Sequence, residues 1–140
     1  MYKRILVAVE NSDADRVILL HATELAKLTG ASLLLVHVAD GWAARHFDDL
    51  NLRESEEMRQ DRGYLEYLAA ELREMGLAVE ARLALGDPAS ALVRVAEQED
   101  VDLIAMSTHG HRFIKDVVLG TTVDRVRHTV KVPVLLLRAR

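Results

Sequence analysis

Two glycine-containing segments near the end of the chain carry the residue types best suited to bind a ligand. Residues 107–112 read Ser-Thr-His-Gly-His-Arg, and residues 120–122, Gly-Thr-Thr, follow after a gap of nine residues from Gly110. Glycine lets the backbone approach a ligand closely. The first turn of a helix offers free amides and a partial positive charge, which suit a phosphate. If residues 120–122 open a helix, its amides, the two threonine hydroxyls and the cations Arg112 and Lys115 would form a phosphate site.

A structural role for the same residues stays open. Thr121 followed by Asp124 also matches a capping box, which satisfies the start of a helix without any ligand. No Gly-Lys-Ser/Thr follows the loop and no G-x-G-x-x-G is present, so the chain has neither a Walker loop nor a dinucleotide fingerprint.

The chain shows no recognisable catalytic set. His109 and His111 are two residues apart, but a metal site needs further ligands and the sequence offers none, so we expect no metal held by the protein itself. The bases that could reach a hydrolytic water are Glu10, Asp13, His109 and His111. Asp13 is explained more simply as a helix cap, and His37, inside an apolar run, is predicted to be a packed core histidine.

Composition narrows the class of protein. The 140 residues fit one domain, and the absence of cysteine excludes thiol catalysis, disulfides and thiolate metal sites. With 18 basic and 22 acidic residues the formal net charge is -4, which argues against nonspecific nucleic-acid binding. No apolar stretch is long enough to cross a membrane, and the first residues show no secretory signal. We therefore expect a cytoplasmic protein.

Hydrophobic patterning predicts an α/β fold. Apolar, β-branched runs at 5–9, 33–38, 79–83, 103–106 and 134–137 alternate with helical patterns, in the order βαβαβαβαβ. Such alternation indicates a parallel sheet with right-handed crossovers. Gly30 and Gly76 mark helix ends, Asp87 and Pro88 a helix start, and the last helix is expected to begin at Gly120.

Two consequences follow for the position of a site. Ligands of open parallel sheets bind beyond the carboxyl ends of the strands, so the loops at 10–13, 39–41 and 107–112 are the places to expect one. Residues 40–62 show little periodicity and are predicted to form a mobile loop leading into a helix. Trp42 and Phe47 in that segment could fold over a ligand or pack on the helix, and the sequence does not choose between these alternatives.

Several segments together resemble the universal stress protein family, and the resemblance covers nearly the whole chain. They are residues 2–9 (YKRILVAV), 34–38 (LLVHV), 86–89 (GDPA), 101–104 (VDLI), 106–110 (MSTHG), 120–122 (GTT) and 132–135 (VPVL). The resemblance implies a single domain with an open parallel five-stranded sheet of order 3-2-1-4-5. Helices would cover both faces in a Rossmann-like, three-layer nucleotide-binding sandwich.

The resemblance also implies a site. One branch of the family binds ATP through G-x-x-G, nine residues and G-S/T, which here reads Ser107-x-x-Gly110 and Gly120-Thr121. It implies that Ser107 lies beside the ribose. The phosphates would be held by Gly110, Gly120, Thr121, Thr122 and the Val123 amide, the adenine by the Val38 backbone and Ala8, Val9 and Glu10, with Met106, His109, His111 and Arg112 completing the site.

Two residues depart from the family pattern. Ser107 replaces a glycine and adds bulk near the sugar, and Glu10 replaces an aspartate and is one methylene longer. Either change could reshape adenine recognition, while the phosphate-binding residues remain.

The function implied is that of an ATP-binding regulatory protein of the stress response with weak or no hydrolysis. A Mg²⁺ or Mn²⁺ ion would be held mainly by the phosphates. A slow ATPase and a nucleotide-free dimeric interaction module are the alternatives. The apolar segment Val134–Leu137 would lie at the sheet edge, where unpaired strands invite association, so we expect a homodimer through it.

Overall fold

The computed structural model describes residues 1–39, 56–108 and 115–139, without the side chains of residues 115–120. The described chain contains a five-stranded parallel sheet in the order β3-β2-β1-β4-β5. The strands are β1 (Arg4–Ala8), β2 (Ser32–Ala39), β3 (Val79–Leu85), β4 (Leu103–Thr108) and β5 (Val134–Arg138). The predicted fold class and strand order are confirmed.

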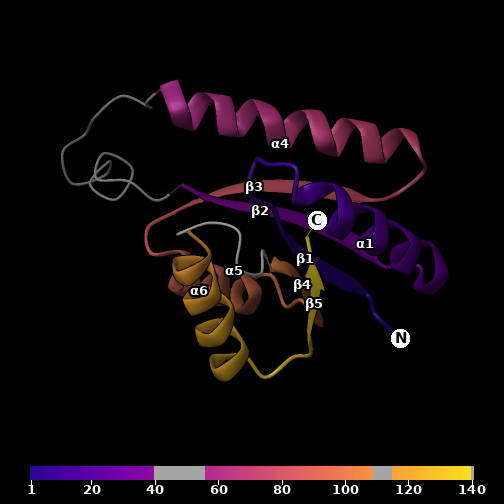
Figure 1. Ribbon diagram of the computed structural model, residues 1–140. Coiled ribbons are helices and arrows are strands. Elements are labelled where there is room, and N and C mark those ends of the chain that lie inside the picture. Colours follow the sequence, from indigo (N-terminus) through magenta and orange to yellow (C-terminus); the bar gives the residue numbers. More distant parts are fainter. Residues whose placement is uncertain (40–55, 109–114, 140) are drawn as a thin grey trace.

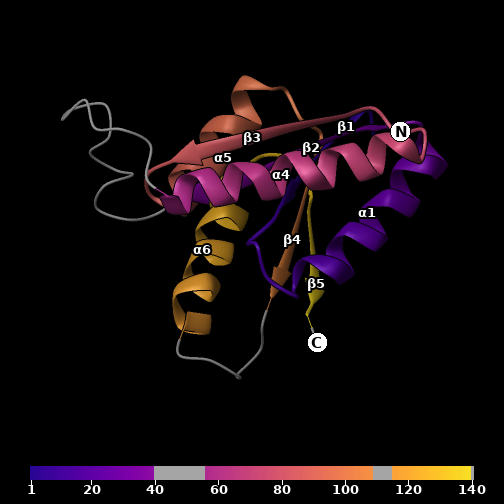
Figure 2. The same ribbon diagram turned by 90° about the horizontal axis from the view of Figure 1, so that it is seen from above.

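In the described part of the chain, four helices cover the two faces of this sheet (Figure 1). They are α1 (Asp15–Thr29), α4 (Glu56–Glu74), α5 (Pro88–Gln98) and α6 (Lys115–Thr129). Helices α1 and α4 pack on one face, and α5 and α6 on the other. Seen from above, α4 runs along β2 and β3 while α1 lies toward β5 (Figure 2).

The alternation of side chains along each strand creates two separate cores. Ile5 and Val7 of β1 point into the core beneath α1 and α4, whereas Leu6 points into the core beneath α5 and α6. Leu33 and Leu35 of β2 repeat the first pattern. A strand buried on both faces reads as a continuous apolar run, which is why the central strands were recognisable in the sequence.

Two predicted helix starts are wrong. Residues 56–62 were expected in a loop, but α4 begins at Glu56, and Met58 and Asp61 are both buried on its inner face. Because one position on this buried face is an aspartate, the apolar residues of this segment do not show a helical period in the sequence. The last helix begins at Lys115 and not at Gly120. A glycine within a helix costs about 1 kcal/mol relative to alanine but does not end it.

Helix ends fall at the predicted positions where the backbone requires a special residue. Gly30 has a φ of 76° and its amide donates to the Ala26 carbonyl over 2.8 Å, so it closes α1 in the left-handed conformation that glycine tolerates. Gly86, with a φ of 113°, turns the chain between β3 and α5. Asp87 then caps α5 ahead of Pro88, as predicted.

The Asp87 cap also connects the two helices of its layer. Its carboxylate accepts the Ser90 amide at 3.0 Å, the Ser90 hydroxyl at 2.8 Å and a guanidinium N–H of Arg125 on α6 at 2.9 Å. These bonds hold the pKa of Asp87 below its ordinary value. The bond from the Ser90 amide has the largest effect, followed by those from the Ser90 hydroxyl and from Arg125.

We therefore expect Asp87→Ala to lower the free energy of unfolding by about 1 kcal/mol at neutral pH. A carboxylate with a lowered folded-state pKa contributes stability above the unfolded pKa and loses it as the pH falls through the folded pKa. The difference between the two proteins should thus shrink below about pH 4. Urea unfolding at neutral pH and below about pH 4 measures the free-energy difference between wild type and variant. Glu97→Ala on the same helix is the control. An equal loss at both pH values would contradict the cap.

Candidate functional site

The carboxyl edge of the sheet brings the sequence-predicted residues together around β1. Since β1 pairs with β2 on one side and β4 on the other, the ends of these three strands are neighbours. Ala8, Val38 and Met106 all point to the α5/α6 side, where Ala8 and Val38 are half-buried and Met106 is buried. They form an apolar surface at the end of that core, of which Ala8 and Val38 are the partly exposed members, and Val123 of α6 belongs to the same core.

The threonines of the predicted phosphate segment lie inside α6. Thr121 is exposed, whereas Thr122 and Val123 are buried. Only the first four amides of a helix lack an intrahelical acceptor. With α6 starting at Lys115, those free amides precede Gly120, so the expected reason for phosphate binding at residues 120–123 does not apply in this structure. Residues 109–112, predicted to complete the site, lie outside the described chain.

The Ser107 hydroxyl has a structural partner. Ser107 points to the α1 side of β4, is buried, and donates to the Ala14 carbonyl at 3.2 Å. It therefore connects the end of β4 to the start of α1. The serine that departs from the family pattern uses its added oxygen in this contact.

A buried carboxylate organises the loop after β1. Asp15, in the first turn of α1, is only 2% exposed. It accepts the backbone amides of Glu10 at 2.8 Å, Asn11 at 2.9 Å and Ser12 at 3.3 Å. Asp13 is the residue predicted to cap this helix, but Asp15 binds these amides. The available signal was an acidic residue in the first helical turn, where the helix dipole favours negative charge.

A second buried carboxylate joins this loop to the neighbouring strand and helix. One oxygen of Asp61 on α4 accepts the Asn11 side-chain amide at 3.0 Å, and the other lies 3.2 Å from Nε2 of His37 on β2. Nδ1 of His37 lies 2.9 Å from the Val9 carbonyl. His37 is well packed, as predicted, but it is also the centre of a polar network that sequence reasoning did not find.

Tyr64 completes the network. Its hydroxyl donates to Asp15 over 2.5 Å. Burial first, then the hydrogen bond to Asp15 and the nearby charges of Asp15 and Asp13, raise the pKa of Tyr64 above its ordinary value. The inner face of α4 carries Asp61, Tyr64 and the apolar Leu65, which are spaced as residues on one side of a helix. The partners of Asp61 and Tyr64 are far away in the sequence.

Most of the backbone amide and carbonyl groups at the end of β1 have hydrogen-bonding partners in this network or in the sheet. The Val9 amide donates to the Val36 carbonyl at 2.9 Å, the Val9 carbonyl faces His37, and the Glu10 amide donates to Asp15. The Glu10 carboxylate accepts the Ser12 hydroxyl at 3.1 Å on the exposed side of the loop. The loop is thus held from the α1/α4 side, and the apolar Ala8 at the end of β1 faces the other side.

Two observations concern other kinds of site. Among residues 1–39, 56–108 and 115–139, no three histidine or acidic side chains come together as metal ligands. In the same ranges, every helix is too short or too polar to cross a lipid bilayer.

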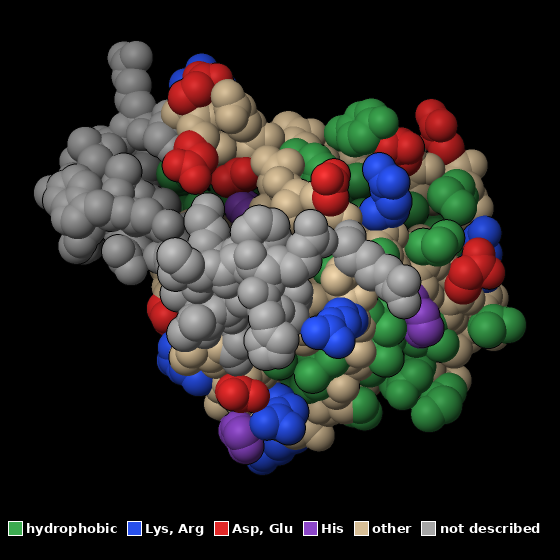
Figure 3. Space-filling model, viewed as in Figure 1, with side chains coloured by type: hydrophobic (Ala, Val, Ile, Leu, Met, Phe, Trp, Pro, Cys, Tyr) green, Lys and Arg blue, Asp and Glu red, His purple; other side chains and the backbone are tan. Residues whose placement is uncertain are grey.

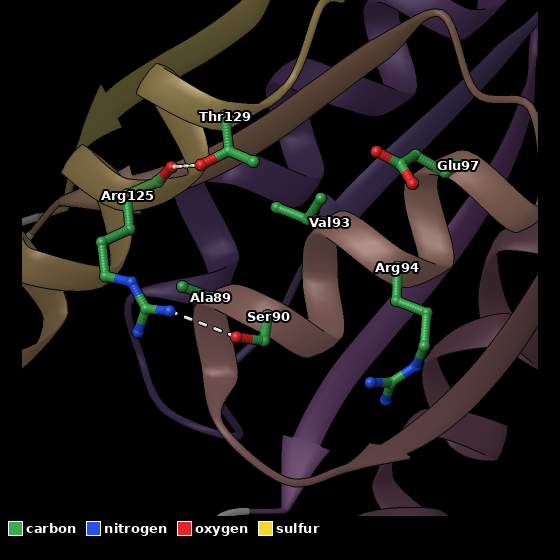
Figure 4. A pocket seen from close by; sticks show the side chains of 7 residues that line it. All are labelled: Ala89, Ser90, Val93, Arg94, Glu97, Arg125 and Thr129. Carbon is green, nitrogen blue, oxygen red and sulfur yellow. Dashed lines mark hydrogen bonds between the residues drawn. The ribbon is translucent and has the colours of Figure 1, made fainter.

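A shallow groove of about 290 Å³ lies between α5 and α6 (Figure 4). Val93 forms part of its lining, and Arg125 and Thr129 face it from α6. The Arg125 guanidinium is already bound to Asp87 and to the Ser90 hydroxyl, the latter at 3.2 Å. None of the sequence-predicted site residues that the structure describes lines this groove.

The network leads to a prediction for Tyr64→Phe. Removing the hydroxyl leaves Asp15 without one donor and should lower the free energy of unfolding by about 1–2 kcal/mol at neutral pH. A tyrosine with a raised folded-state pKa contributes stability below the unfolded pKa, and this is lost as the pH rises through the folded pKa. The advantage of the wild type should therefore shrink above about pH 10. Urea unfolding tests this, with exposed Tyr67→Phe on the same helix as a control that should change little; equal effects of both variants would contradict it.

Comparison with known proteins finds relatives of this chain in one family and solved structures with the same fold. The pattern that defines the Universal stress protein family matches residues 1–138. A universal stress protein of Thermus aquaticus is 32% identical over 142 residues, covering 99% of this chain and all of the relative. Universal stress protein MJ0577 of Methanocaldococcus jannaschii is 26% identical over 157 residues, covering 100% and 97%.

Solved structures agree. The MJ0577 structure is similar with a TM-score of 0.83 and 27% identity, covering 100% of this chain and 98% of that one. A universal stress protein of Archaeoglobus fulgidus, solved in complex with dAMP, has a TM-score of 0.70 at 23% identity, with 96% and 97% covered. The match over nearly its full length shows that this chain belongs to the universal stress protein family.

Proposed function

We propose that this protein binds an adenine nucleotide, ATP, at the carboxyl edge of the sheet between β1 and β4. The observation that carries the proposal is the apolar surface of Ala8, Val38 and Met106 on the α5/α6 side of that edge. It lies at the point where the strand order reverses: β2 and β3 follow on one side of β1, and β4 and β5 follow on the other. Ligands of open parallel sheets bind at such a point, and apolar surfaces suit the faces of a purine.

Family membership supports an adenine ligand. The Archaeoglobus fulgidus relative binds dAMP, which shares the base with ATP. The motif residues Gly110, Gly120 and Thr121 are those expected to approach the phosphates, with Arg112 as a cation nearby. Thr121 of this set is exposed. A Mg²⁺ or Mn²⁺ ion would be bound mainly through the phosphates, because such ions keep water and few protein ligands.

The proposed role is regulatory: nucleotide occupancy would alter an interaction during the stress response, with little or no hydrolysis. Two buried carboxylates near the site, Asp15 and Asp61, are engaged by loop amides and by His37 on the face opposite the apolar surface. They hold the loop and are poorly placed to activate a water on the other face. This arrangement favours binding over a slow ATPase.

Isothermal titration with ATP and Mg²⁺ tests the proposal directly. The wild type should bind ATP with micromolar affinity, and Gly120→Val should weaken binding at least tenfold, because the proposed approach of the Gly120 backbone to the phosphates needs a residue without a side chain. Titration with AMP shows how much of the affinity depends on the outer phosphates.

Thr129→Val provides the matched control, because it places the same side chain near the other end of α6, where Thr129 is exposed. This variant should bind ATP as the wild type does. No ATP binding by the wild type would overturn the proposal and favour the nucleotide-free module. Steady turnover well above the uncatalysed rate would favour the ATPase.

We also propose a homodimer through β5. This strand forms one end of the sheet, and Leu136 on it is 36% exposed. Apolar side chains gather on the side of the molecule where β5, α1 and the start of the chain lie (Figure 3). On α1, Leu20 and Leu28 are 65% and 84% exposed. An unpaired edge strand beside apolar surface is a ready site for a second copy.

Leu136→Lys should therefore raise the dimer dissociation constant at least tenfold, because a charge would be buried at the pairing edge. Sedimentation equilibrium measures this constant. Tyr67→Lys, at an exposed position on α4, should leave it unchanged. A wild type that is monomeric at high micromolar concentration would rule out the β5 dimer.

A further inference from the structure

The polar network on the α1/α4 face lies directly across the sheet edge from the proposed base-binding surface. It connects four parts of the chain: the end of β1, the loop of residues 10–12, the end of β2 and the first half of α4. Its ionisable members are His37, Asp61, Asp15 and Tyr64. The position of the loop after β1 therefore depends on contacts to α4, a helix some 50 residues later.

The hydrogen bonds around His37 fix the number of protons in the network. The Val9 carbonyl can only accept, so Nδ1 of His37, 2.9 Å away, carries a hydrogen. Nε2 lies 3.2 Å from an Asp61 oxygen. In a neutral ring with Nδ1 protonated, Nε2 has a lone pair and would face a carboxylate that also has only lone pairs. The contact is a hydrogen bond only when one further proton lies on Nε2 or on Asp61.

The two side chains are packed tightly enough for this proton to matter. Relative exposures of the His37 and Asp61 side chains are 14% and 9%. The other Asp61 oxygen already accepts the Asn11 side-chain amide at 3.0 Å, so Asp61 cannot turn away without losing that bond. Asn11 itself has a φ of 64°, a conformation that needs support from its surroundings.

We propose that His37 and Asp61 are positioning residues that set the affinity for the nucleotide base through their shared proton. With the proton present, the pair binds the Val9 carbonyl from one side and Asn11 from the other. It thereby holds the intervening Glu10 backbone and the adjoining Ala8 surface in place. Without the proton, two lone pairs oppose each other, α4 and the loop separate, and the base loses its fixed surface. The inference rests on the proposed function.

Other charged groups face the pair from the surrounding elements. Asp15 on α1 accepts the backbone amides of Glu10 and Asn11, and Tyr64 on α4 donates to Asp15. Asp13 lies close enough to affect Tyr64, and Glu10 lies on the outer side of the loop.

Asparagine at position 61 separates the proton from the geometry. In Asp61→Asn, the side-chain oxygen can still accept from Asn11, and its amide can donate to Nε2 of a neutral His37. Both contacts of Asp61 survive without the shared proton. In Asp61→Ala both are lost. The two variants should therefore differ in affinity, while both should lose the pH dependence of the wild type.

The test measures ATP affinity by calorimetry between about pH 6 and about pH 9, a range that spans histidine deprotonation. Wild-type affinity should fall about tenfold as the pH rises, as expected for loss of one charged hydrogen bond. Asp61→Asn should keep the low-pH affinity with a flat profile. Asp61→Ala should bind about tenfold more weakly at every pH. Inorganic tripolyphosphate, which has no base, should show the same affinity for all three proteins.

Controls separate this inference from the proposed function. Ionisation of ATP itself is common to all three proteins and cancels in the comparison. Parallel pH profiles of the wild type and Asp61→Asn would overturn the shared proton. An equal loss of tripolyphosphate affinity in Asp61→Ala would overturn base positioning.

A wild type that binds no ATP would contradict the proposed function and remove base positioning with it. ¹⁵N spectra of His37, together with the ¹³C shift of the Asp61 carboxyl group, then decide in the unliganded wild type whether the pair holds a proton. If Asp61→Ala fails to fold, the Asp61→Asn profile and the same spectra still decide. A lone-pair signal at Nε2 below neutral pH, together with an unprotonated Asp61 carboxylate, would overturn the proton count.

Discussion

The structure depends on the burial of β1 on both faces and at both edges. Ile5, Leu6 and Val7 have no exposed surface, and the strand is hydrogen-bonded to β2 and β4. The chain that follows such a strand is buried at Val9 and half-buried at Glu10, so the backbone polar groups there need partners. Side chains from elsewhere must bind them. Asp15 provides this for three successive amides, and His37 for the Val9 carbonyl.

This constraint gives the two sides of the carboxyl edge different properties. On the α1/α4 side, the polar atoms of the loop are engaged and the side chains are closely packed. On the α5/α6 side, the same strands present Ala8, Val38 and Met106, which need no partner. Strand alternation alone produces this division, because neighbouring residues point to opposite faces. A ligand surface on one side can therefore be apolar while its supports on the other side are polar.

The sequence was informative where structure is local. Buried parallel strands read as apolar runs, and Gly30 and Asp87 mark helix ends through backbone geometry that few residues satisfy. It was misleading where tertiary contacts decide. The start of α4 was missed because the position that completes its buried face is Asp61, which reads as a surface residue. The start of α6 was placed too late because Gly120 resembles a helix boundary but lies inside the helix.

The candidate site divides in the same way. Ala8, Val38 and Met106 could be located from strand positions and the resemblance. The partners of Asp15 and Asp61 could not, because Tyr64 and Asn11 are 49 and 50 residues away and meet them only through packing. The hydroxyl of Ser107 shows the same limit: its acceptor, Ala14, lies 93 residues earlier in the chain. A side chain that reads as a ligand contact in sequence can be bound by a distant backbone atom in the fold.

Buried polar contacts of this kind also set how α4 is placed. An apolar face alone would let the helix rotate or slide with little change in buried area, since Leu65, Ala69 and Leu72 could be accommodated in neighbouring positions. Asp61 and Tyr64 permit much less freedom, because each must meet a particular partner or leave a buried polar group unsatisfied at a cost of about 1–3 kcal/mol. The two residues are three positions apart and so lie on one face, where they bind the same loop at Asn11 and Asp15. The rotation of α4 and the conformation of the β1–α1 loop are consequently determined together, and a change in the protonation of one contact would reach both.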